Sequence, residues 1–243
     1  MSRQRADLAL VERGLFESRA KAQQAIAAGN VSVDGKVLRK PSEPIGAEAR
    51  IEAAPPYPWV SRGGVKLEAA LNSFGFDPAG AICFDVGAST GGFTDVLLAR
   101  GAAKVHAIDV GHGQLHPRLR ADPRVILGER KDARDLTPAD FAAPPAFITC
   151  DVSFISLRLV LPSILAVAAQ QAQLISLIKP QFEVGPTHVV KGIVKDAAAR
   201  QEACARIEAL LRDAGWDIAG LIESPIQGSD GNREYLIGAT KIR

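Results

Sequence analysis

Apolar and polar residues follow two different patterns along this chain, one before residue 54 and one after residue 64. The first part contains two short helical segments. The earlier segment directs Leu8 and Val11 to one side. The later segment begins at Ser18, a residue type suited to cap a helix, and ends at Gly29. The residues that it directs inward are Ala22, Ala25 and Ile26.

An alternating segment follows these two helices. From Val31 to Val37, apolar and polar residues alternate around the dipeptide Asp34-Gly35, which is typical of a tight β-hairpin. Residues 1–53 are therefore predicted to form a small α/β domain. Residues 54–64 are rich in proline and end in two glycines, so they are predicted to be a linker.

In residues 65–243, continuous apolar runs alternate with helical stretches. The runs predicted to be strands are Ile82–Val86, Val105–Ile108, Val125–Leu127, Phe147–Cys150 and Leu174–Ile178. The helical stretches include Phe93–Arg100, Leu157–Ala169 and Asp196–Ala214. This alternation predicts an α/β domain with a mostly parallel sheet that is covered on both faces. Two final strands, Ile218–Glu223 and Tyr235–Thr240, are joined by the loop Gln227–Asn232, so the last strand is predicted to be antiparallel.

The composition is that of an ordinary globular protein, with 243 residues, 47% hydrophobic and 23% charged. This composition excludes wholesale disorder. The three widely spaced cysteines favour reduced thiols and a cytoplasmic location over a disulfide scaffold. No apolar signal region is seen at the start, and the longest apolar stretch, residues 159–169, is too short to span a bilayer. No membrane partner is therefore expected.

Ionisable residues gather at the carboxyl ends of the predicted strands, where open parallel sheets bind their ligands. Asp109, Asp151 and Lys179 directly follow or end three strands, and Asp132 comes shortly after another. Glu234 precedes the antiparallel last strand, which begins at the same edge. A single charged residue at a strand end often does no more than meet water. The whole set on one edge predicts a ligand-binding site.

A glycine-rich turn follows the first strand of this sheet. Such a turn lets a ligand approach the backbone closely and opens a helix. Asp109 follows Gly87 by 22 residues, a spacing from which a carboxylate can bridge two ribose hydroxyls. Ser89 replaces the middle glycine of the dinucleotide motif, so a cofactor with a single nucleoside is favoured.

The same turn also matches the G-x-S-x-G motif of serine hydrolases. That interpretation requires a downstream histidine, and His188 is the candidate that the sequence offers. It would leave Lys179 and Glu234 without a role, so it is not favoured.

Five segments in order carry a family resemblance. They are Ser61–Leu67 (SRGGVKL), Asp85–Asp95 (DVGASTGGFTD), Cys150–Phe154 (CDVSF), Ile178–Glu183 (IKPQFE) and Gly231–Tyr235 (GNREY). With them the chain resembles the TlyA/hemolysin A family of ribosomal RNA 2′-O-methyltransferases, which have an FtsJ-like catalytic domain. The resemblance implies a Rossmann-like methyltransferase fold for residues 65–243. Residues 1–53 resemble a small RNA-binding domain shared with a ribosomal protein.

The resemblance also implies a catalytic tetrad, made of Lys66, Asp151, Lys179 and Glu234. Lys179 would remove or share the proton of a ribose 2′-hydroxyl, held in place by Asp151 and Glu234, while Lys66 would bind that hydroxyl or a neighbouring phosphate. The implied cofactor is S-adenosylmethionine. Residues expected to line its cleft are Asp85, Gly87, Ser89, Thr90, Gly91, Gly92, Asp109 and Asp132. The implied partner is ribosomal RNA or a ribosomal subunit, with a cytidine as the target.

Positive charge is concentrated in the first domain. The whole chain has a net charge of only +2, but residues 1–40 carry +4 and the remainder carries −2. Residues expected to contact RNA phosphates are Arg3, Arg5, Arg19, Lys21, Lys36, Arg39 and Lys40. The alternative is a basic face that is merely solvated.

The sequence also suggests other functions, which its residues favour less. A non-catalytic RNA-binding or ribosome-assembly factor would retain the same fold, but the complete tetrad favours an enzyme. A membrane-lytic activity, suggested by the word hemolysin, is disfavoured because no basic amphipathic helix is seen. His112 and His116 have the spacing of a metal pair, but Gly113 and Pro117 argue against a helix, so no metal site is predicted. The oligomeric state is left open.

Overall fold

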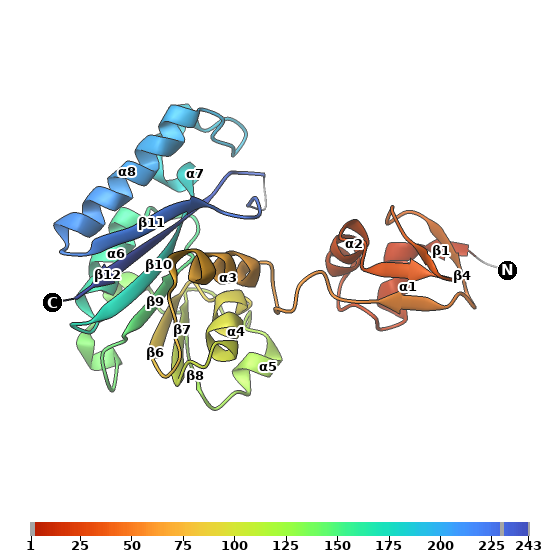
Figure 1. Ribbon diagram of the computed structural model, residues 1–243, viewed down its shortest axis with the longest axis horizontal. Helices are drawn as coiled ribbons and strands as arrows, with labels where there is room; N and C mark the ends of the chain where they lie inside the picture. Colours follow the sequence, from red (N-terminus) through yellow and green to blue (C-terminus); the bar gives the residue numbers. More distant parts are fainter. Residues whose placement is uncertain (1–2, 229–230, 243) are drawn as a thin grey trace. The chain divides into compact units, whose positions relative to one another are not determined.

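The computed structural model describes residues 3–228 and 231–242. The chain divides into two units, one ending at Pro58 and one beginning at Trp59 (Figure 1). The division falls within the segment 54–64 that the sequence predicts as a linker. Part of the predicted loop Gln227–Asn232, namely residues 229–230, lies outside the described residues.

The first unit has two short helices and two small sheets. The helices are α1 (Ala6–Glu12) and α2 (Arg19–Ala27). One sheet pairs β1 (Arg3–Arg5) with β4 (Pro44–Gly46), and the other has the order β3-β2-β5, made of β3 (Lys36–Val37), β2 (Val31–Val33) and β5 (Ile51–Ala53). The predicted hairpin is confirmed, because β2 pairs antiparallel with β3 and both residues of its turn, Asp34 and Gly35, have positive φ.

The core of the first unit differs from the sequence prediction in one helix. Ser18 caps α2, and the three residues predicted to face inward from α2 are buried. In α1, however, Leu8 and Val11 are only half-buried. Ala6, Ala9 and Leu10 fill the core instead. Val11 packs against the edge of this core, and the buried face of α1 also includes Asp7, a polar residue that an apolar pattern does not count.

The second unit is built on a seven-stranded sheet of order β11-β12-β10-β9-β6-β7-β8. Its strands are β6 (Ile82–Val86), β7 (Lys104–Asp109), β8 (Val125–Glu129), β9 (Phe147–Cys150), β10 (Ala172–Ile178), β11 (Asp217–Glu223) and β12 (Tyr235–Lys241). β6 to β10 are parallel to one another, and β12 is antiparallel to both β10 and β11. The predicted sheet is thus confirmed, including its antiparallel last strand.

Helices cover both faces of this sheet (Figure 1). The longer ones are α3 (Gly63–Phe74), α4 (Gly92–Ala99), α6 (Leu157–Ala166) and α8 (Ala197–Asp213), and the short ones are α5 (Pro117–Arg120), α7 (Pro180–Glu183), η1 (Ala133–Asp135), η2 (Pro138–Asp140) and η3 (Pro186–His188). The core beside α6 and α8 is separate from the core beside α3 and α4. Successive residues of β10 show why, since Leu174 faces the first core and Ile175 faces the second.

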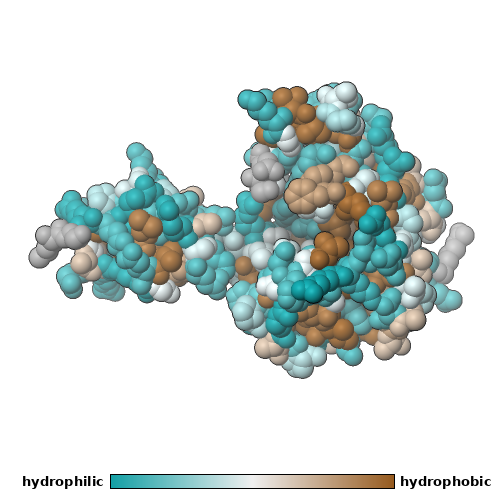
Figure 2. Space-filling view, turned by 180° about the vertical axis from the view of Figure 1, so that it is seen from behind, coloured by the Kyte–Doolittle hydropathy of each residue, from teal (hydrophilic) through white to brown (hydrophobic). Residues whose placement is uncertain are grey.

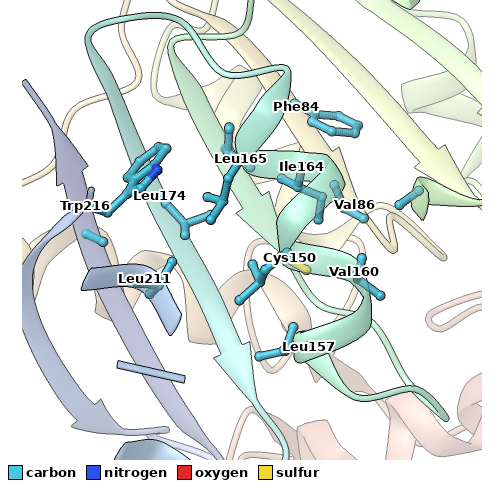
Figure 3. Close-up of a cluster of buried hydrophobic side chains, with 14 of the residues drawn as sticks. Phe84, Val86, Cys150, Leu157, Val160, Ile164, Leu165, Leu174, Leu211 and Trp216 are labelled. Atoms are coloured by element: carbon cyan, nitrogen blue, oxygen red, sulfur yellow. The ribbon is translucent and has the colours of Figure 1, made fainter. Parts of the chain in front are cut away.

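Figure 3 shows part of the core beside α6 and α8, where Leu157, Val160 and Ile164 of α6 meet Val86 and Cys150 of the sheet. These side chains are almost completely buried. On the outside, hydrophilic residues cover most of the surface with hydrophobic patches between them (Figure 2). Two of the most exposed apolar residues are Val110 and Phe154, at 69% and 91% exposure.

Strand register brings the predicted site residues to one edge. Val86 lies beside Ile108 and Cys150, so the residues that follow these positions, Gly87, Asp109 and Asp151, are neighbours at the carboxyl edge. On the other side of β9, Ile178 of β10 lies beside Tyr235 of β12. The residue after Ile178 and the residue before Tyr235 are Lys179 and Glu234. The antiparallel direction of β12 is therefore what places a late glutamate among the ends of the parallel strands.

Candidate active site

Two ion pairs lie at this carboxyl edge. Lys66 Nζ is 2.5 Å from Glu234 Oε2, and both side chains are nearly buried, at 10% and 3% exposure. Lys179 Nζ is 2.6 Å from Asp151 Oδ1. Lys66 comes from α3 and the other three residues come from strand ends, so the fold collects all four members of the predicted tetrad at one edge.

The pairing within the tetrad differs from the one that the resemblance implies. Glu234 was expected to hold Lys179, but it holds Lys66. Lys179 is held by Asp151 and donates a hydrogen bond of 2.6 Å to Ser153 Oγ. The Asp151–Lys179 contact is an ion pair without hydrogen-bond alignment, because Asp151 Oδ1 is buried and accepts no hydrogen bond. Ser153 therefore contributes the aligned contact that orients the lysine.

A cleft of about 460 Å³ opens beside Asp151. Its walls are the glycine-rich turn and the loops that follow β7, β8 and β9. The lining residues predicted from the sequence are Gly87, Ser89, Asp109 and Asp132. A second cavity of about 220 Å³ shares Gly87, Ser89 and Asp151 with the cleft, and its lining also includes Lys66, Thr90 and Gly92. Asp151 and Lys66 thus face adjoining cavities. Gly91 lines neither of them.

The glycine-rich turn is shaped by its backbone. Gly87 has a φ of +80°, and a Cβ there would lie 2.5 Å from the carbonyl oxygen of Asp151. Only glycine allows the turn to approach the residue that follows β9 so closely. Asp109 fastens the turn from the other side, because its Oδ2 accepts from Ser89 N at 2.8 Å and its Oδ1 accepts from Gly111 N at 2.7 Å.

Asp132 lies on the far wall of the cleft, at the start of η1. Its carboxylate accepts hydrogen bonds from the backbone and guanidinium of Arg134. The Arg134 side chain is the main cause that lowers the pKa of Asp132 to about 2. Asp132 is therefore an anion at neutral pH, and both of its oxygens can accept hydrogen bonds.

Asp85 was expected to line the cofactor cleft, but the structure places it inside the domain. It is fully buried and lines neither cavity. Its oxygens accept from Thr94 Oγ1 at 2.6 Å and from Thr149 Oγ1 at 2.8 Å. Burial raises the pKa of Asp85 to about 6. The residue joins β6 to β9 and α4 from within, so it supports the turn rather than touching a ligand.

Several lining residues were missed by the sequence analysis, among them Gln114, Lys131, Ser153 and Phe154. Phe154 is unusual because it is 91% exposed and its backbone has a φ of +66°, which residues other than glycine rarely adopt. Ser153 and Phe154 lie in the segment Cys150–Phe154 that carries the family resemblance, and this was the signal in the sequence that pointed to them. The positions of Gln114 and Lys131 depend on how two loops fold over the cleft, which no local pattern reveals.

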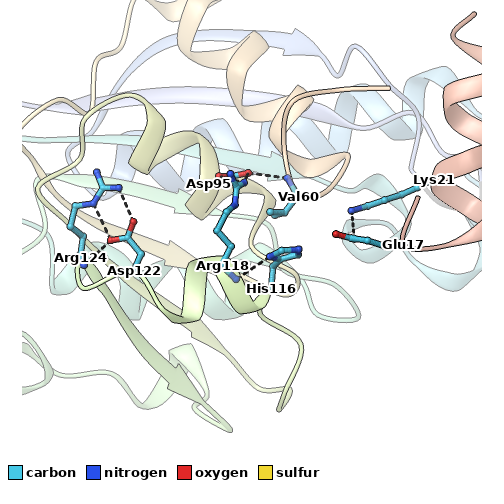
Figure 4. Close-up of polar contacts among 8 residues, drawn as sticks. All are labelled: Glu17, Lys21, Val60, Asp95, His116, Arg118, Asp122 and Arg124. Carbon is cyan, nitrogen blue, oxygen red and sulfur yellow. Dashed lines mark hydrogen bonds and ion pairs between the residues drawn. The ribbon is translucent and has the colours of Figure 1, made fainter. Parts of the chain in front are cut away.

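The end of the linker packs on α3 and on the first turn of α4. The side chain of Trp59 lies against Gly64, and Val60 is part of the core beside α3. Val60 N donates to Asp95 Oδ2 at 2.9 Å, and Arg118 binds the same carboxylate at 2.7 Å (Figure 4). Asp95 belongs to the first turn of α4. Trp59 and Val60 therefore belong to the catalytic unit rather than to a free linker.

In the first unit, two of the predicted RNA-binding arginines have a structural partner. Arg5 and Arg19 each bind the fully buried Asp7 at 3.0 Å, and Gln23 donates to it as well. These donors, Arg5 foremost, hold the pKa of Asp7 well below its usual range. Lys21 pairs with Glu17 (Figure 4). Within the described residues, Arg3, Lys36, Arg39 and Lys40 form no side-chain ion pair.

Ser89, His188 and His112 suggested a hydrolase or a metal site in the sequence. In the structure they contact other residues. Ser89 Oγ donates to Gln114 Oε1 rather than to a histidine, and His188 lies 3.9 Å from Asp196. This arrangement does not form a hydrolase triad. His112 Nδ1 lies 2.8 Å from Glu129 Oε2. Across residues 3–228 and 231–242, no group of three His, Cys, Asp or Glu side chains is placed to hold a metal, and no helix is long and apolar enough to cross a bilayer.

Comparison with known proteins agrees with this geometry. Residues 59–241 match the family described as FtsJ-like methyltransferase, and residues 4–51 match the S4 domain. The chain is 43% identical, over 97% of its length and 89% of the relative, to the 16S/23S rRNA (cytidine-2′-O)-methyltransferase TlyA of Mycobacterium tuberculosis. It is 42% identical to hemolysin A of Brachyspira hyodysenteriae, over 92% of this chain and 94% of that protein.

A solved structure of a Streptococcus thermophilus protein is similar over both units. It is 40% identical and has a TM-score of 0.77, and the match covers 99% of this chain and 89% of that one. The similarity therefore extends to the small unit and is not limited to the catalytic sheet.

Proposed function

The chain belongs to the TlyA family of FtsJ-like methyltransferases with an S4 domain, and from this premise we propose that it transfers a methyl group from S-adenosylmethionine to a ribose 2′-hydroxyl of ribosomal RNA. The observation that carries the proposal is the arrangement of Lys66, Asp151, Lys179 and Glu234 as two ion pairs beside the cleft. The name of the Mycobacterium tuberculosis relative supports a cytidine as the target.

The residues of the larger cleft fit S-adenosylmethionine. Asp109 stands at the end of β7, where a carboxylate suits ribose hydroxyls, and apolar residues such as Val86, Ile108 and Val152 offer a surface for a flat base. The carboxylates of Asp132 and Asp151 suit a cofactor that carries positive charge on sulfur. When bound, the cofactor supplies a methyl group that is already activated for transfer.

Lys179 is the residue placed to handle the proton. As the ribose oxygen forms its bond to the methyl carbon, the hydroxyl proton must leave. Lys179 Nζ can accept that proton once it has released one of its own to water, and Asp151 at 2.6 Å stabilises the ammonium that forms again. The hydrogen bond to Ser153 fixes the direction of the lysine. General-base catalysis of this kind contributes about 10²–10⁴-fold, so alignment of the two substrates supplies much of the remaining acceleration.

Lys66 has a different task. It lines the smaller cavity and is held by Glu234, which is itself 3% exposed. A charge held in this way is suited to bind the reacting hydroxyl or a phosphate next to it, because its side chain does not have to be ordered when the RNA arrives. The S4 unit, with its basic side chains, would supply the sequence-independent affinity for RNA.

The test is methyl transfer from labelled cofactor to ribosomal RNA by the full chain and by the variant Lys179→Ala. We expect the variant to lose about 10²–10⁴-fold in kcat while cofactor affinity stays within a few-fold, because the lost group acts on the proton. Lys104→Ala is the matched control, since that exposed lysine begins β7 at the opposite edge of the sheet.

Two results would contradict the proposal. Full activity of Lys179→Ala would remove the assigned role of the lysine. A wild-type chain that binds ribosomal RNA and cofactor but transfers no methyl group would instead be a binding or assembly factor. Mapping 2′-O-methylation in ribosomal RNA from cells with and without the gene would identify the nucleotide.

A further inference from the structure

We propose that Glu183, which the catalytic tetrad does not include, is a positioning residue that holds the Asp151–Lys179 pair at its working distance. The inference rests on the proposed function, because it concerns the lysine that handles the proton. Glu183 is the last residue of α7, four positions after Lys179. It acts on the segment 151–156, which follows the neighbouring strand β9.

The two catalytic residues stand on separate strand ends that continue into irregular loops. The backbone pairing between β9 and β10 ends at Cys150 and Ser176. Beyond that point, no ladder of backbone hydrogen bonds fixes the distance between Asp151 and Lys179. Side-chain contacts between segment 151–156 and segment 179–183 join the two ends directly.

Glu183 contacts the end of segment 151–156 and the residue that follows it. Its Oε2 accepts from Ser156 Oγ at 2.6 Å, and its Oε1 accepts from Leu157 N at 2.7 Å. The residue is 8% exposed, and within the described residues it forms no ion pair with a cation. Its negative charge is balanced by the first turn of α6, whose N-terminus favours anions. The carboxylate thus fastens the start of α6 to the end of α7.

The segment that Glu183 fastens is strained. Phe154, between Asp151 and Ser156, has a φ of +66° and is almost fully exposed. Such a conformation costs about 1–3 kcal/mol and persists only where the surroundings impose it. Lys179 holds the segment on one side of Phe154 through Ser153, and Glu183 holds it on the other side through Ser156.

A ring contact adds to the same connection. The rings of Phe154 and Phe182 have centroids 5.3 Å apart, which again joins the two segments. Without Glu183, the Phe154 backbone is free to relax, and Ser153 would move with it. Lys179 would then lose its aligned hydrogen bond and part of its contact with Asp151. An error of about 1 Å at such a group can lower the rate by about 10²-fold.

The experiment compares Glu183→Ala and Glu183→Gln in the full chain. We expect Glu183→Ala to lower kcat about 10- to 100-fold, with little change in KM for RNA, and to shift the pH profile of kcat because Lys179 loses its fixed partner. Glu183→Gln should recover most of kcat, since the amide oxygen can accept from Leu157 N and the amide nitrogen can donate to Ser156 Oγ.

Asp196→Ala serves as the control for a lost helix cap, because Asp196 caps α8 and lines neither cavity. We expect it to lower stability without changing kcat or its pH profile. A Glu183→Ala variant that behaves like this control would overturn the inference. If Glu183→Ala does not fold, Ser156→Ala decides the matter. That variant should lower kcat, since it removes one of the two contacts, and an unchanged kcat would refute the positioning role.

The proposed function fails in a different way. If the wild-type chain and Glu183→Ala both bind cofactor but neither transfers methyl groups, the methyltransferase assignment is wrong. If the wild-type chain is active and Glu183→Ala has the same kcat and pH profile, the assignment stands and only the role of Glu183 is wrong.

Discussion

At the scale of single residues, the structure separates two aspartates that look alike in the sequence. Asp7 and Asp85 are both fully buried. Asp7 is surrounded by the cations Arg5 and Arg19, so its charged form is favoured. Asp85 accepts from the hydroxyls of Thr94 and Thr149 and from the backbone of Thr94 but has no cation as a partner in the described part of the chain, and burial raises its pKa to about 6. The nature of the donors, which come from distant positions, decides whether a buried carboxyl keeps its charge.

This difference predicts a pH dependence for the catalytic unit. Between about pH 4 and pH 6, the folded state keeps the Asp85 proton while the unfolded state releases it, so this residue makes the free energy of unfolding fall as the pH rises. The free energy of unfolding is lowered by about 3 kcal/mol above pH 6, and it is not lowered below pH 4. Asp85→Asn should flatten this part of the stability curve.

The measurement is denaturant unfolding followed by tryptophan fluorescence between pH 4 and pH 7. Both tryptophans, Trp59 and Trp216, lie in the second unit, so the signal reports on that unit alone. Asp213→Asn, which removes an exposed carboxyl near the end of α8, is the matched control. Parallel curves for wild type and Asp85→Asn would show that Asp85 does not titrate in this range.

At the scale of elements, periodicity predicted the strands well because both faces of a covered sheet must be apolar. Ile82–Val86 and Phe147–Cys150 were predicted with the bounds that the structure has. Periodicity could not predict side-chain contacts between elements that are distant in the sequence. The pairing of Glu234 with Lys66 depends on how α3 lies against β12, and the lining residue Gln114 depends on a loop fold. The resemblance identified which residues matter, but their partners required the fold.

The turn after β6 makes a testable prediction at this scale. Gly87→Ala should weaken cofactor binding at least tenfold, because its Cβ would meet the carbonyl oxygen of Asp151 and push the turn away from β9. Gly80→Ala is matched in backbone, with a φ of +70°, but its Cβ would meet nothing within 4 Å. Both variants should lose a similar amount of stability from the strained φ.

Calorimetric titration of cofactor into the two variants distinguishes steric from conformational effects. Only Gly87→Ala should lose affinity. Equal affinities in the two proteins would mean that the turn can move without affecting the cleft.

At the scale of the whole molecule, charge is divided between two units with different tasks. The first unit is basic, yet two of its arginines are engaged by Asp7. Lys36, Arg39 and Lys40 carry no such partner among the described residues and remain available for phosphates. The whole net charge of +2 lies on this first unit, because residues 59–243 hold as many acidic as basic side chains. Net charge is therefore a poor guide to RNA binding in a chain with two units.

We predict that the triple variant Lys36→Ala, Arg39→Ala and Lys40→Ala lowers affinity for ribosomal RNA and reduces the slope of log affinity against log salt by about 0.7–0.9 per lost phosphate contact. Cofactor affinity should not change. Arg206→Ala, on the surface of α8, is the control for lost positive charge. An unaltered salt slope would show that these residues do not contact phosphates.

The place of β12 also has a consequence for the timing of synthesis. Lys66 and its partner Glu234 are separated by 168 positions, so their pair closes only after nearly all of the described chain has been made. A nascent chain that has emerged only as far as β10 has most of the cleft but lacks the glutamate that holds Lys66. Such long-range pairings also form slowly. We therefore expect the Lys66–Glu234 pair to be absent from a chain that stops before β12.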